Sequence, residues 1–588
     1  MSGTLPTEEF ASHLTRSTET LSPEEAQQVA PYFTNADRSV VALTNLPEVV
    51  KGALFSRYSR SSKGVRRLFL DEFMGGMKET ADLPPVVGGE HSRVARQRAE
   101  AFYARVLSEY GDDSVGELGG AHIAFQEISQ LAAKRIEDHR VGLAFLEKSS
   151  RYVPFDDKVA GHYRYYRDRT LLDSRFGSRV VATLDGLFDA YSAMLPRMMA
   201  HIESTFPIDD VEFENGLTGE VQPYLEIGDE DFKKSAAFAY RQSVRAQACD
   251  LLRCFLPMAT LTNVGVWGNG RALEYIILNL LADPLPENRW LARAAQHELD
   301  HVIGPFVRRA DDAHGRRQQE YLRATRAAER RLAERYLDPS TAGTRVPLPA
   351  PTPPNTKVML VHYDADAVEQ VAAAILFPAS SENKTDVLRA VMQLSPDELK
   401  QIVEEYTGTR ENRRNKPGRA FEHARYEFDL LLNIGEFRDL QRHRLVTPQR
   451  QGFTTAHGYE TNSAILEVPE IRAAFDANME QADAVYRMVS EEYPEEAQYL
   501  VPYAYRVRYN VEMNLRELYH WVELRTSEHG HPDYRITSQQ MFQAVQSVHP
   551  MLVQGMQFVN LKPNAPMSRL RAEMRSVRRR LEQTAKQE

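Results

Sequence analysis

Two stretches of this 588-residue chain carry the same landmarks in the same order. Each has a glutamate, then His-Arg, then Pro-x-Ala, then Asn-x-Arg: Glu117, His139-Arg140, Pro257-Met258-Ala259 and Asn269-Gly270-Arg271 in the first, and Glu422, His443-Arg444, Pro502-Tyr503-Ala504 and Asn514-Leu515-Arg516 in the second. The step from the proline to the asparagine is 12 residues in both. Because chance seldom gives shared order and shared spacing together, we predict two diverged copies of one domain.

A proline-rich segment marks the boundary between the two copies. Six prolines stand between Pro339 and Pro354, a density that excludes a helix and favours an extended spacer. We therefore predict a first domain over 1–335, a linker over 336–356 and a second domain over 357–588. His-Arg precedes Pro-x-Ala by 118 residues in the first copy and by 59 in the second, which predicts an insertion in the first copy at about 157–240.

Composition narrows the class of protein. Lys and Arg number 72 against 82 Asp and Glu, and the resulting net charge of −10 excludes a general basic surface for nucleic acid. Two cysteines are too few for a disulfide scaffold. No apolar run approaches the roughly 18 residues of a membrane-spanning helix, and the N-terminus lacks the basic start and apolar run of a signal peptide. We expect a cytoplasmic protein that binds neither nucleic acid nor a membrane.

One segment has the spacing of a zinc site. In His297-Glu298-Leu299-Asp300-His301 the two histidines would share a helical face and could hold zinc. The extended pattern needs a third histidine, and Val307 stands in its place. We interpret the match as accidental and predict no metal site.

Arginine-rich segments suggest anion binding. Gln441-Arg442-His443-Arg444 and Glu147-Lys148-Ser149-Ser150-Arg151 combine guanidinium groups with an amide, hydroxyls and a carboxylate. Such groups can bind a phosphate and read a base or sugar edge, although each segment alone also fits a surface ion-pair cluster. The basic runs Arg413-Arg414-Asn415-Lys416 and Arg578-Arg579-Arg580 are interpreted as solvated faces, with anion contact as the alternative.

These segments resemble a known family. Residues 437–447 are similar to the first half of the signature of the flavin-dependent thymidylate synthases, Arg-His-Arg-x-x-Ser-x-Asn-Glu-x-Ser-x-Arg. The first copy resembles the family at 114–117, 147–152, 253–257, 269–271 and 295–299. The last match implies a helix without metal ligands at His297 and His301. The resemblance implies an α+β fold class with two tandem copies of the domain, each helix-rich with a small sheet.

The two copies depart from the signature in complementary ways. The first copy keeps Glu147, Ser149, Arg151 and Arg253, whereas Leu280 replaces the arginine that ends the Asn-x-Arg helix. The second copy keeps Arg442, His443, Arg444 and Arg525, whereas Gln498 replaces the arginine before the Pro-x-Ala motif and 449–454 replaces the second half of the signature. Family active sites lie between subunits of a homotetramer, so the resemblance implies one composite site made from both copies. A homodimer of four domains would imitate the tetramer.

The resemblance also implies an activity. It predicts reductive methylation of a uracil nucleotide, dUMP to dTMP, with FAD as cofactor and NADPH and methylenetetrahydrofolate as co-substrates. The implied catalytic residues are Arg442, His443 and Arg444. Substrate binding is implied for Glu147, Ser149, Arg151, Arg253, Arg442 and Arg525, and flavin binding for Ser114, Glu117, His443, Arg444, Asn514, Arg516 and His520. The alternatives are a catalytically inactive fold relative that binds nucleotide or a partner, and a flavoenzyme that acts on another pyrimidine. Cys249 and Cys254 are interpreted as core residues.

Overall fold

The computed structural model describes residues 20–38, 40–59, 61–74, 116–151, 153–215, 220–337, 356–528, 530–563 and 570. The chain forms two compact units, each treated by itself below. Unit 1 contains the described residues of Met1–Gln126, Arg135–Glu147 and Asn263–Thr344, and unit 2 those of Glu127–Lys134, Lys148–Thr262 and Arg345–Glu588. Residues 148–262 thus cluster with the second copy, whereas the domain boundaries drawn from the repeat remain a prediction. The proline-rich segment lies outside the described residues.

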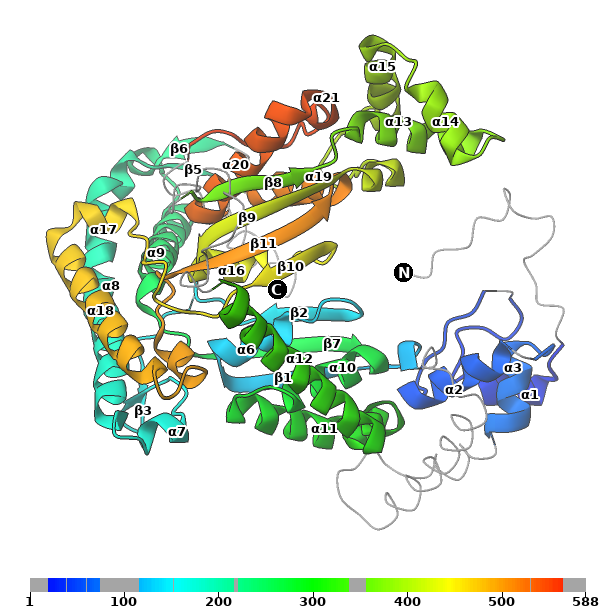
Figure 1. Ribbon diagram of the computed structural model, residues 1–588, viewed down its shortest axis with the longest axis horizontal. Helices are drawn as coiled ribbons and strands as arrows, with labels where there is room; N and C mark the ends of the chain where they lie inside the picture. The colour runs from blue at the N-terminus through cyan, green and yellow to red at the C-terminus, as the bar shows by residue number, and fades with distance from the viewer. Residues whose placement is uncertain are drawn as a thin grey trace. The chain divides into compact units, whose positions relative to one another are not determined.

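Unit 1 is built around a three-stranded sheet in the order β1-β7-β2. Strand β2 pairs antiparallel with the central strand β7, from Leu143 opposite Gly268 to Glu147 opposite Val264. Its elements are α1 (Pro23–Val29), α2 (Glu48–Tyr58), α3 (Val65–Leu68), β1 (Gly120–Ser129), α6 (Gln130–Glu137), β2 (Leu143–Glu147), β7 (Leu261–Asn269), α10 (Gly270–Leu281), α11 (Pro286–Val307) and α12 (Ala313–Leu337). The end of β1 and the start of α6, Glu127–Lys134, are assigned to unit 2. Helices α10 and α11 pack against each other (Figure 1).

Unit 2 contains a four-stranded antiparallel sheet in the order β10-β11-β9-β8. The central strands pair over nine residues, from Arg506 opposite Asn433 to Asn514 opposite Arg425. The elements of this part are β8 (Val358–Tyr363), α13 (Ala367–Leu376), α14 (Lys384–Val391), α15 (Pro396–Thr407), β9 (Arg425–Asn433), α16 (Ile434–Leu440), β10 (Val446–Arg450), α17 (Ser463–Glu467), α18 (Pro469–Ser490), β11 (Arg506–Asn514), α19 (Leu515–Arg525), α20 (Pro532–Val548) and α21 (Pro550–Val553). Helix α20 packs against α19 and β8 (Figure 1).

The segment predicted as an insertion forms a helical layer of unit 2. It contains β3 (Lys158–Val159), β4 (His162–Tyr163), α7 (Arg169–Leu172), α8 (Gly177–Thr205), β5 (Glu212–Glu214), β6 (Val221–Pro223) and the start of α9 (Glu230–Leu252). Val180, Leu184, Leu187 and Tyr191 recur at helical spacing on α8 and are buried. This face explains why α8 packs along α18 and α9 (Figure 1).

The two Pro-x-Ala motifs pair with each other inside unit 2. Pro257 and Pro502 form an antiparallel bridge. The N–H groups of Met258 and Ala259 donate to the carbonyls of Val501 and Tyr499, both at 3.0 Å. The reciprocal bonds run from Tyr503 to Leu256 at 3.0 Å and from Ala504 to Cys254 at 3.1 Å. Each bond therefore has a counterpart 245 positions along the chain, as a repeat related by a local two-fold axis requires.

The predicted fold class is confirmed, since the chain is helix-rich with small sheets. Ser395 forms a capping box with Glu398 at the start of α15. None of the helices in the described part of the chain is both long and apolar enough to cross a membrane.

Candidate functional site

Arg253 is anchored at the end of α9. It lies in a 3₁₀ turn, Arg253–Phe255, and is 4% exposed. Its Nη2 donates to the Gly435 carbonyl at 3.0 Å, and its Nη1 lies 3.5 Å from Oδ2 of Asp439. A Cβ on Gly435 would lie 3.4 Å from Nε of Arg253, so a glycine here lets the guanidinium approach the start of α16.

Arg151 joins the same neighbourhood through Asp250. Its Nε lies 3.1 Å from both carboxylate oxygens of Asp250, and its backbone N–H donates to Oγ of Ser149 at 3.2 Å. Asp250 is on α9, less than one turn before Arg253, and its Oδ1 lies 3.7 Å from Nε of Arg253. One buried carboxylate thus binds both arginines of the first copy.

Arginines of both copies influence the charge of Asp439, on α16. Burial raises the pKa of Asp439, but Arg253, Arg151, Arg525 and Arg442 together outweigh burial and hold it at about 2. Asp439 is therefore ionised at neutral pH. We call Arg151, Arg253, Arg442 and Arg525 the arginine cluster. All four belong to unit 2, and Nη1 of Arg253 lies 3.5 Å from Oδ2 of Asp439.

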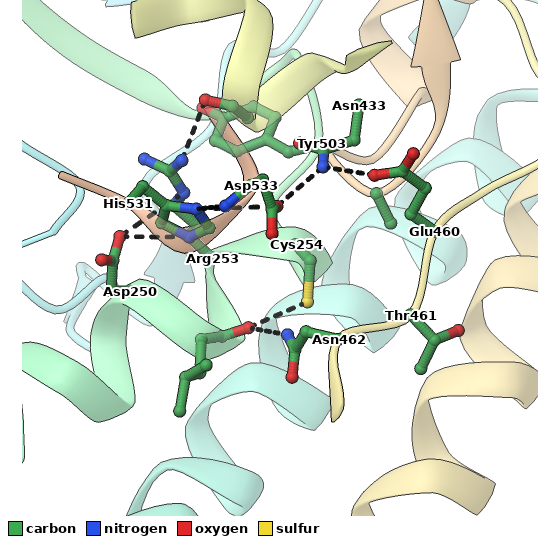
Figure 2. A pocket seen from close by; sticks show the side chains of 13 residues that line it. Asp250, Arg253, Cys254, Asn433, Glu460, Thr461, Asn462, Tyr503, His531 and Asp533 are labelled. Carbon is green, nitrogen blue, oxygen red and sulfur yellow. Dashed lines mark hydrogen bonds and ion pairs between the residues drawn. The ribbon is translucent and has the colours of Figure 1, made fainter. Parts of the chain in front are cut away.

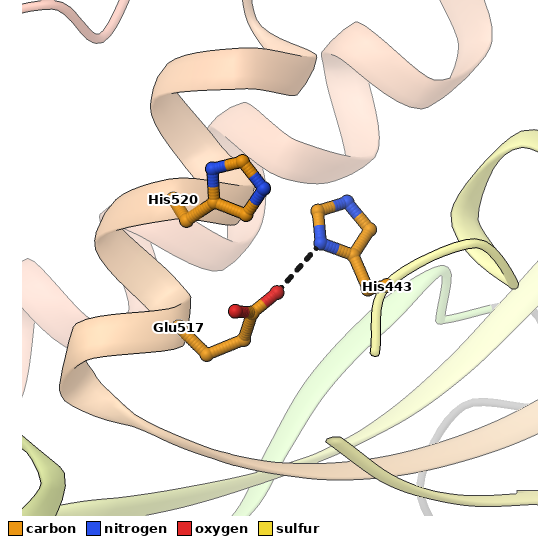
Figure 3. Close-up of side chains that lie close together, drawn as sticks. All are labelled: His443, Glu517 and His520. Carbon is orange, nitrogen blue, oxygen red and sulfur yellow. Dashed lines mark hydrogen bonds and ion pairs between the residues drawn. The ribbon is translucent and has the colours of Figure 1, made fainter. Parts of the chain in front are cut away.

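His443 is held in one tautomer beside this cluster. Its Nδ1 lies 2.8 Å from Oε1 of Glu517 (Figure 3), and its Nε2 accepts from Nε of Arg525 at 3.0 Å. Because a guanidinium can only donate, Nε2 carries no proton and Nδ1–H donates to the carboxylate. The ring stacks on Trp521, with centroids 4.1 Å apart. A neutral, oriented imidazole from the segment after α16 therefore binds both Glu517 and the cluster residue Arg525 on α19.

Cations surround the polar start of α19. Burial raises the pKa of Glu517 to about 7, against the opposing effects of Lys416, Arg516 and Arg525. Burial, Lys416, Arg525 and Arg413 lower the pKa of His520 to about 4. Exposed Lys416 and Arg413 thus act on the histidine that was predicted to bind flavin, although we had interpreted their segment as a solvated face. This set of cationic and polar donors fits an anionic cofactor such as FAD.

The other predicted flavin residues are dispersed. Glu117 pairs with Arg271 at 2.9 Å in unit 1, just as Glu422 pairs with Arg516 at 3.3 Å in unit 2. Asn514 caps α19 by accepting from the N–H of Glu517 at 2.9 Å, and Arg444 is exposed after α16. Ser114 lies outside the described residues. Among the predicted substrate residues, Glu147 is buried at the end of β2 in unit 1.

Among the described residues, His443, Glu517 and His520 form the one group with ligand atoms close enough to hold a metal ion, all within 4.8 Å (Figure 3). Glu517 and Arg525 already bind both ring nitrogens of His443, so a metal would have to displace one of them. His297 and His301 are exposed on α11, with ring centroids 5.2 Å apart. The absence of a metal site remains a prediction.

A small cavity of about 50 Å³ adjoins the arginine cluster (Figure 2). Its polar lining includes Asp250, Arg253, Cys254, Glu460, His531 and Asp533. Nε2 of His531 lies 3.6 Å from Oδ1 of Asp250. Burial lowers the pKa of His531, which keeps the imidazole neutral. Cys249 is buried, as expected for a core residue, whereas Cys254 is half-buried and lines this cavity.

The positions that lost their arginines have structural roles. Oε1 of Gln498 accepts from the N–H of Phe453 at 3.2 Å, within the segment that replaces the second half of the signature. Leu280 is 1% exposed on α10. Both side chains stabilise the fold where the family signature would place an arginine.

Sequence reasoning missed the acids that accompany the arginines. Asp439 stood within the signature-like segment, but it received no role. Glu517 directly follows Arg516, and Asp250 precedes Arg253 by three residues, which is helical spacing. An acid three residues before two of the four arginines, Asp250 before Arg253 and Asp439 before Arg442, was the available signal.

Comparison with known proteins places the chain in a family. The family described as "Thymidylate synthase complementing protein" matches residues 70–303 and 359–551. The chain belongs to this family, and the two matched segments confirm the expected tandem arrangement.

The chain is similar to two relatives along most of its length. A UPF0159 protein of Chlamydia muridarum is 39% identical over 559 residues, covering 94% of this chain and 98% of the relative. A UPF0159 protein of Thermoplasma acidophilum is 36% identical over 530 residues, covering 89% of this chain and 98% of the relative.

Among solved structures, a flavin-dependent thymidylate synthase from Helicobacter pylori, complexed with FAD and dUMP, is 20% identical with a TM-score of 0.25, covering 34% of this chain and 97% of that one. A UMP/dUMP methylase from Streptomyces cacaoi, bound with 5-Br dUMP, is 18% identical with a TM-score of 0.28, covering 34% and 94%.

Proposed function

We propose that the protein is an FAD-dependent enzyme that methylates a uracil nucleotide, converting dUMP to dTMP at the arginine cluster. The observation that carries this proposal is the arrangement of arginines from both copies in unit 2. Arg151 and Arg253 of the first copy share Asp250, at 3.1 and 3.7 Å, and Arg253 lies 3.5 Å from Asp439 of the second copy. Arg525 binds His443 at 3.0 Å, and the charges of Arg525 and Arg442 also lower the pKa of Asp439. Surface ion-pair clusters would not sort themselves across the two copies in this way. Membership of the thymidylate synthase complementing family supports the reaction class.

The proposed roles follow from the chemistry of each side chain. Arg151 and Arg253, with Ser149, bind the phosphate and sugar of the substrate, and a substrate role for Glu147 stays a prediction from the sequence. Arg442 and Arg525 would supply guanidinium groups that stabilise charge developing on the pyrimidine carbonyls. The fixed, neutral imidazole of His443 orients Arg525 by accepting its Nε–H. Arg444 is the third proposed catalytic residue.

The flavin would be held by His443, Arg444, Asn514, Arg516 and His520, with Ser114 and Glu117 as further proposed contacts. Bound FAD supplies the redox chemistry, with NADPH as reductant and methylenetetrahydrofolate as the carbon donor. We also propose a cytoplasmic homodimer in which four domains imitate a tetramer.

The first experiment is purification followed by flavin analysis. We expect a yellow protein that binds FAD saturably and dUMP at one site per chain. With NADPH and methylenetetrahydrofolate, it should form dTMP. Protein that binds dUMP but no FAD would overturn the enzymatic proposal in favour of a nucleotide-binding fold relative. Methylation of a different pyrimidine, with none of dUMP, would establish the other alternative.

A further inference from the structure

The arginine cluster is already partly neutralised by the protein's own acids. Nε of Arg151 lies 3.1 Å from both oxygens of Asp250, and Nη1 of Arg253 lies 3.5 Å from Oδ2 of Asp439. Both acids are largely withdrawn from solvent, with 7% of the Asp250 side chain and 19% of the Asp439 side chain exposed. An incoming phosphate therefore meets two fixed negative charges as well as four positive ones.

The two acids differ in what they hold. Asp250 contacts Arg151, Arg253 and His531, so it organises the first copy's side of the site. Asp439 makes one long contact to Arg253, yet all four cluster arginines act on its carboxylate. Arg253 keeps the Gly435 carbonyl and Asp250 as partners whether or not Asp439 is charged. Asp439 thus faces Arg253 and lies in the positive field of the cluster, without being the main support of these arginines.

We infer that Asp439 is a specificity-determining residue that competes with the substrate phosphate for the arginine cluster. A carboxylate and a phosphate oxygen seek the same guanidinium donors, and two like charges at this range repel each other. The cluster therefore binds the phosphate more loosely than four unopposed arginines would. Recognition of the substrate then depends more on the base and the sugar. This inference rests on the proposed function, because it takes the cluster as the phosphate site.

The test compares two ligands that differ only in the phosphate. dUMP and deoxyuridine are titrated by calorimetry into the full-length protein saturated with FAD, using the wild type and Asp439→Asn. Asparagine keeps the size of aspartate and removes its charge. We expect Asp439→Asn to bind dUMP at least tenfold more tightly and deoxyuridine with unchanged affinity. Inorganic phosphate should compete with dUMP at least tenfold better in the variant.

Asp429→Asn is the matched control. Asp429 is likewise a partly buried acid that pairs with an arginine, but its partner is Arg508, at 3.3 Å, which is not one of the four cluster arginines. It should leave the affinity for dUMP unchanged. If Asp439→Asn melts early, Asp439→Ser serves as the second variant, and unchanged deoxyuridine binding reports an intact site.

Two results would overturn the inference. Equal or weaker dUMP binding by Asp439→Asn, with deoxyuridine binding intact, would make Asp439 a support for the arginines and leave the proposed function standing. A protein that binds FAD but neither ligand would remove the cluster as a phosphate site, and the substrate of the proposed function would fail with it.

Discussion

At the scale of single residues, the site depends on guanidinium groups that are held before any ligand arrives. Arg151 and Arg525 come from different copies and act on the same carboxylate. We predict that Arg151→Ala and Arg525→Ala each weaken dUMP binding ten- to a hundredfold, because a charge-assisted contact contributes about 1.5–3 kcal/mol. Titration calorimetry with FAD-saturated protein measures this.

The control for these variants is Thr454→Ala, at a position where the second copy lost its arginine. It should leave dUMP binding nearly unchanged. Leu280→Ala should also spare binding, but at a buried position it should lower stability by about 2–5 kcal/mol. Wild-type affinity in both arginine variants would exclude a composite site.

Glu517 gives a prediction about pH. Burial raises its pKa to about 7, so the folded protein holds this proton more tightly than the unfolded chain does. The stability that follows is complete below the unfolded pKa, roughly 4.3, and is lost as the pH rises through 7. Glu517→Gln keeps an acceptor for His443 and removes the charge. We predict that the variant melts like wild type near pH 4 and is more stable near pH 8, by at most about 3 kcal/mol. A difference that does not change with pH would contradict this origin of the pKa.

At the scale of elements, the repeat is clearest where a strand turns into a helix. Asn269 follows β7 and accepts from the N–H of Ala272 at 2.8 Å, and Asn514 follows β11 and accepts from the N–H of Glu517 at 2.9 Å. We predict that Asn269→Ala and Asn514→Ala each lower stability by about 0.5–2 kcal/mol, whereas the serine variants retain most of it. Thermal melting of the alanine and serine variants at each position measures the change in stability. Loss of FAD binding in Asn514→Ser, with stability retained, would show a second role in holding the flavin.

Sequence patterns predicted the elements better than the site. The order and spacing of the landmarks were enough to predict the repeat, because the Pro-x-Ala and Asn-x-Arg motifs occur where the backbone changes direction locally. The cap at Ser395 was also readable, since it depends on residues within one turn. Asp439 was not, because its importance comes from arginines up to 288 positions away in the chain. The sequence also did not predict that residues 148–262 cluster with the second copy. An apolar helix face such as that of α8 indicates burial, but it does not indicate which helix will pack against it.

At the scale of the whole molecule, co-expression of two different variant chains tests whether each site is built from a single chain. Arg151 and Arg525 lie in the same unit of the same chain, so a chain that carries either alanine variant has a defective site. We predict that co-expression of Arg151→Ala and Arg525→Ala chains restores no dUMP binding, even in mixed homodimers of the 67.0 kDa chain. Affinity-tagged copies, purified in tandem, isolate the mixed species for titration. Recovery of wild-type affinity in a fraction of the sites would show that each site is shared between chains.

The reciprocal bonds between the Pro-x-Ala segments also impose an order of events during synthesis. The N–H groups of Met258 and Ala259 cannot meet Val501 and Tyr499 until the ribosome has added about 245 further residues. At about 5–20 residues per second, this interval is roughly 12 to 50 s. During that time the nascent first copy exposes an unpaired backbone edge that resembles its future partner. A neighbouring nascent chain on the same messenger offers the same edge, so the spacing of ribosomes influences whether the two copies pair within a chain or between chains.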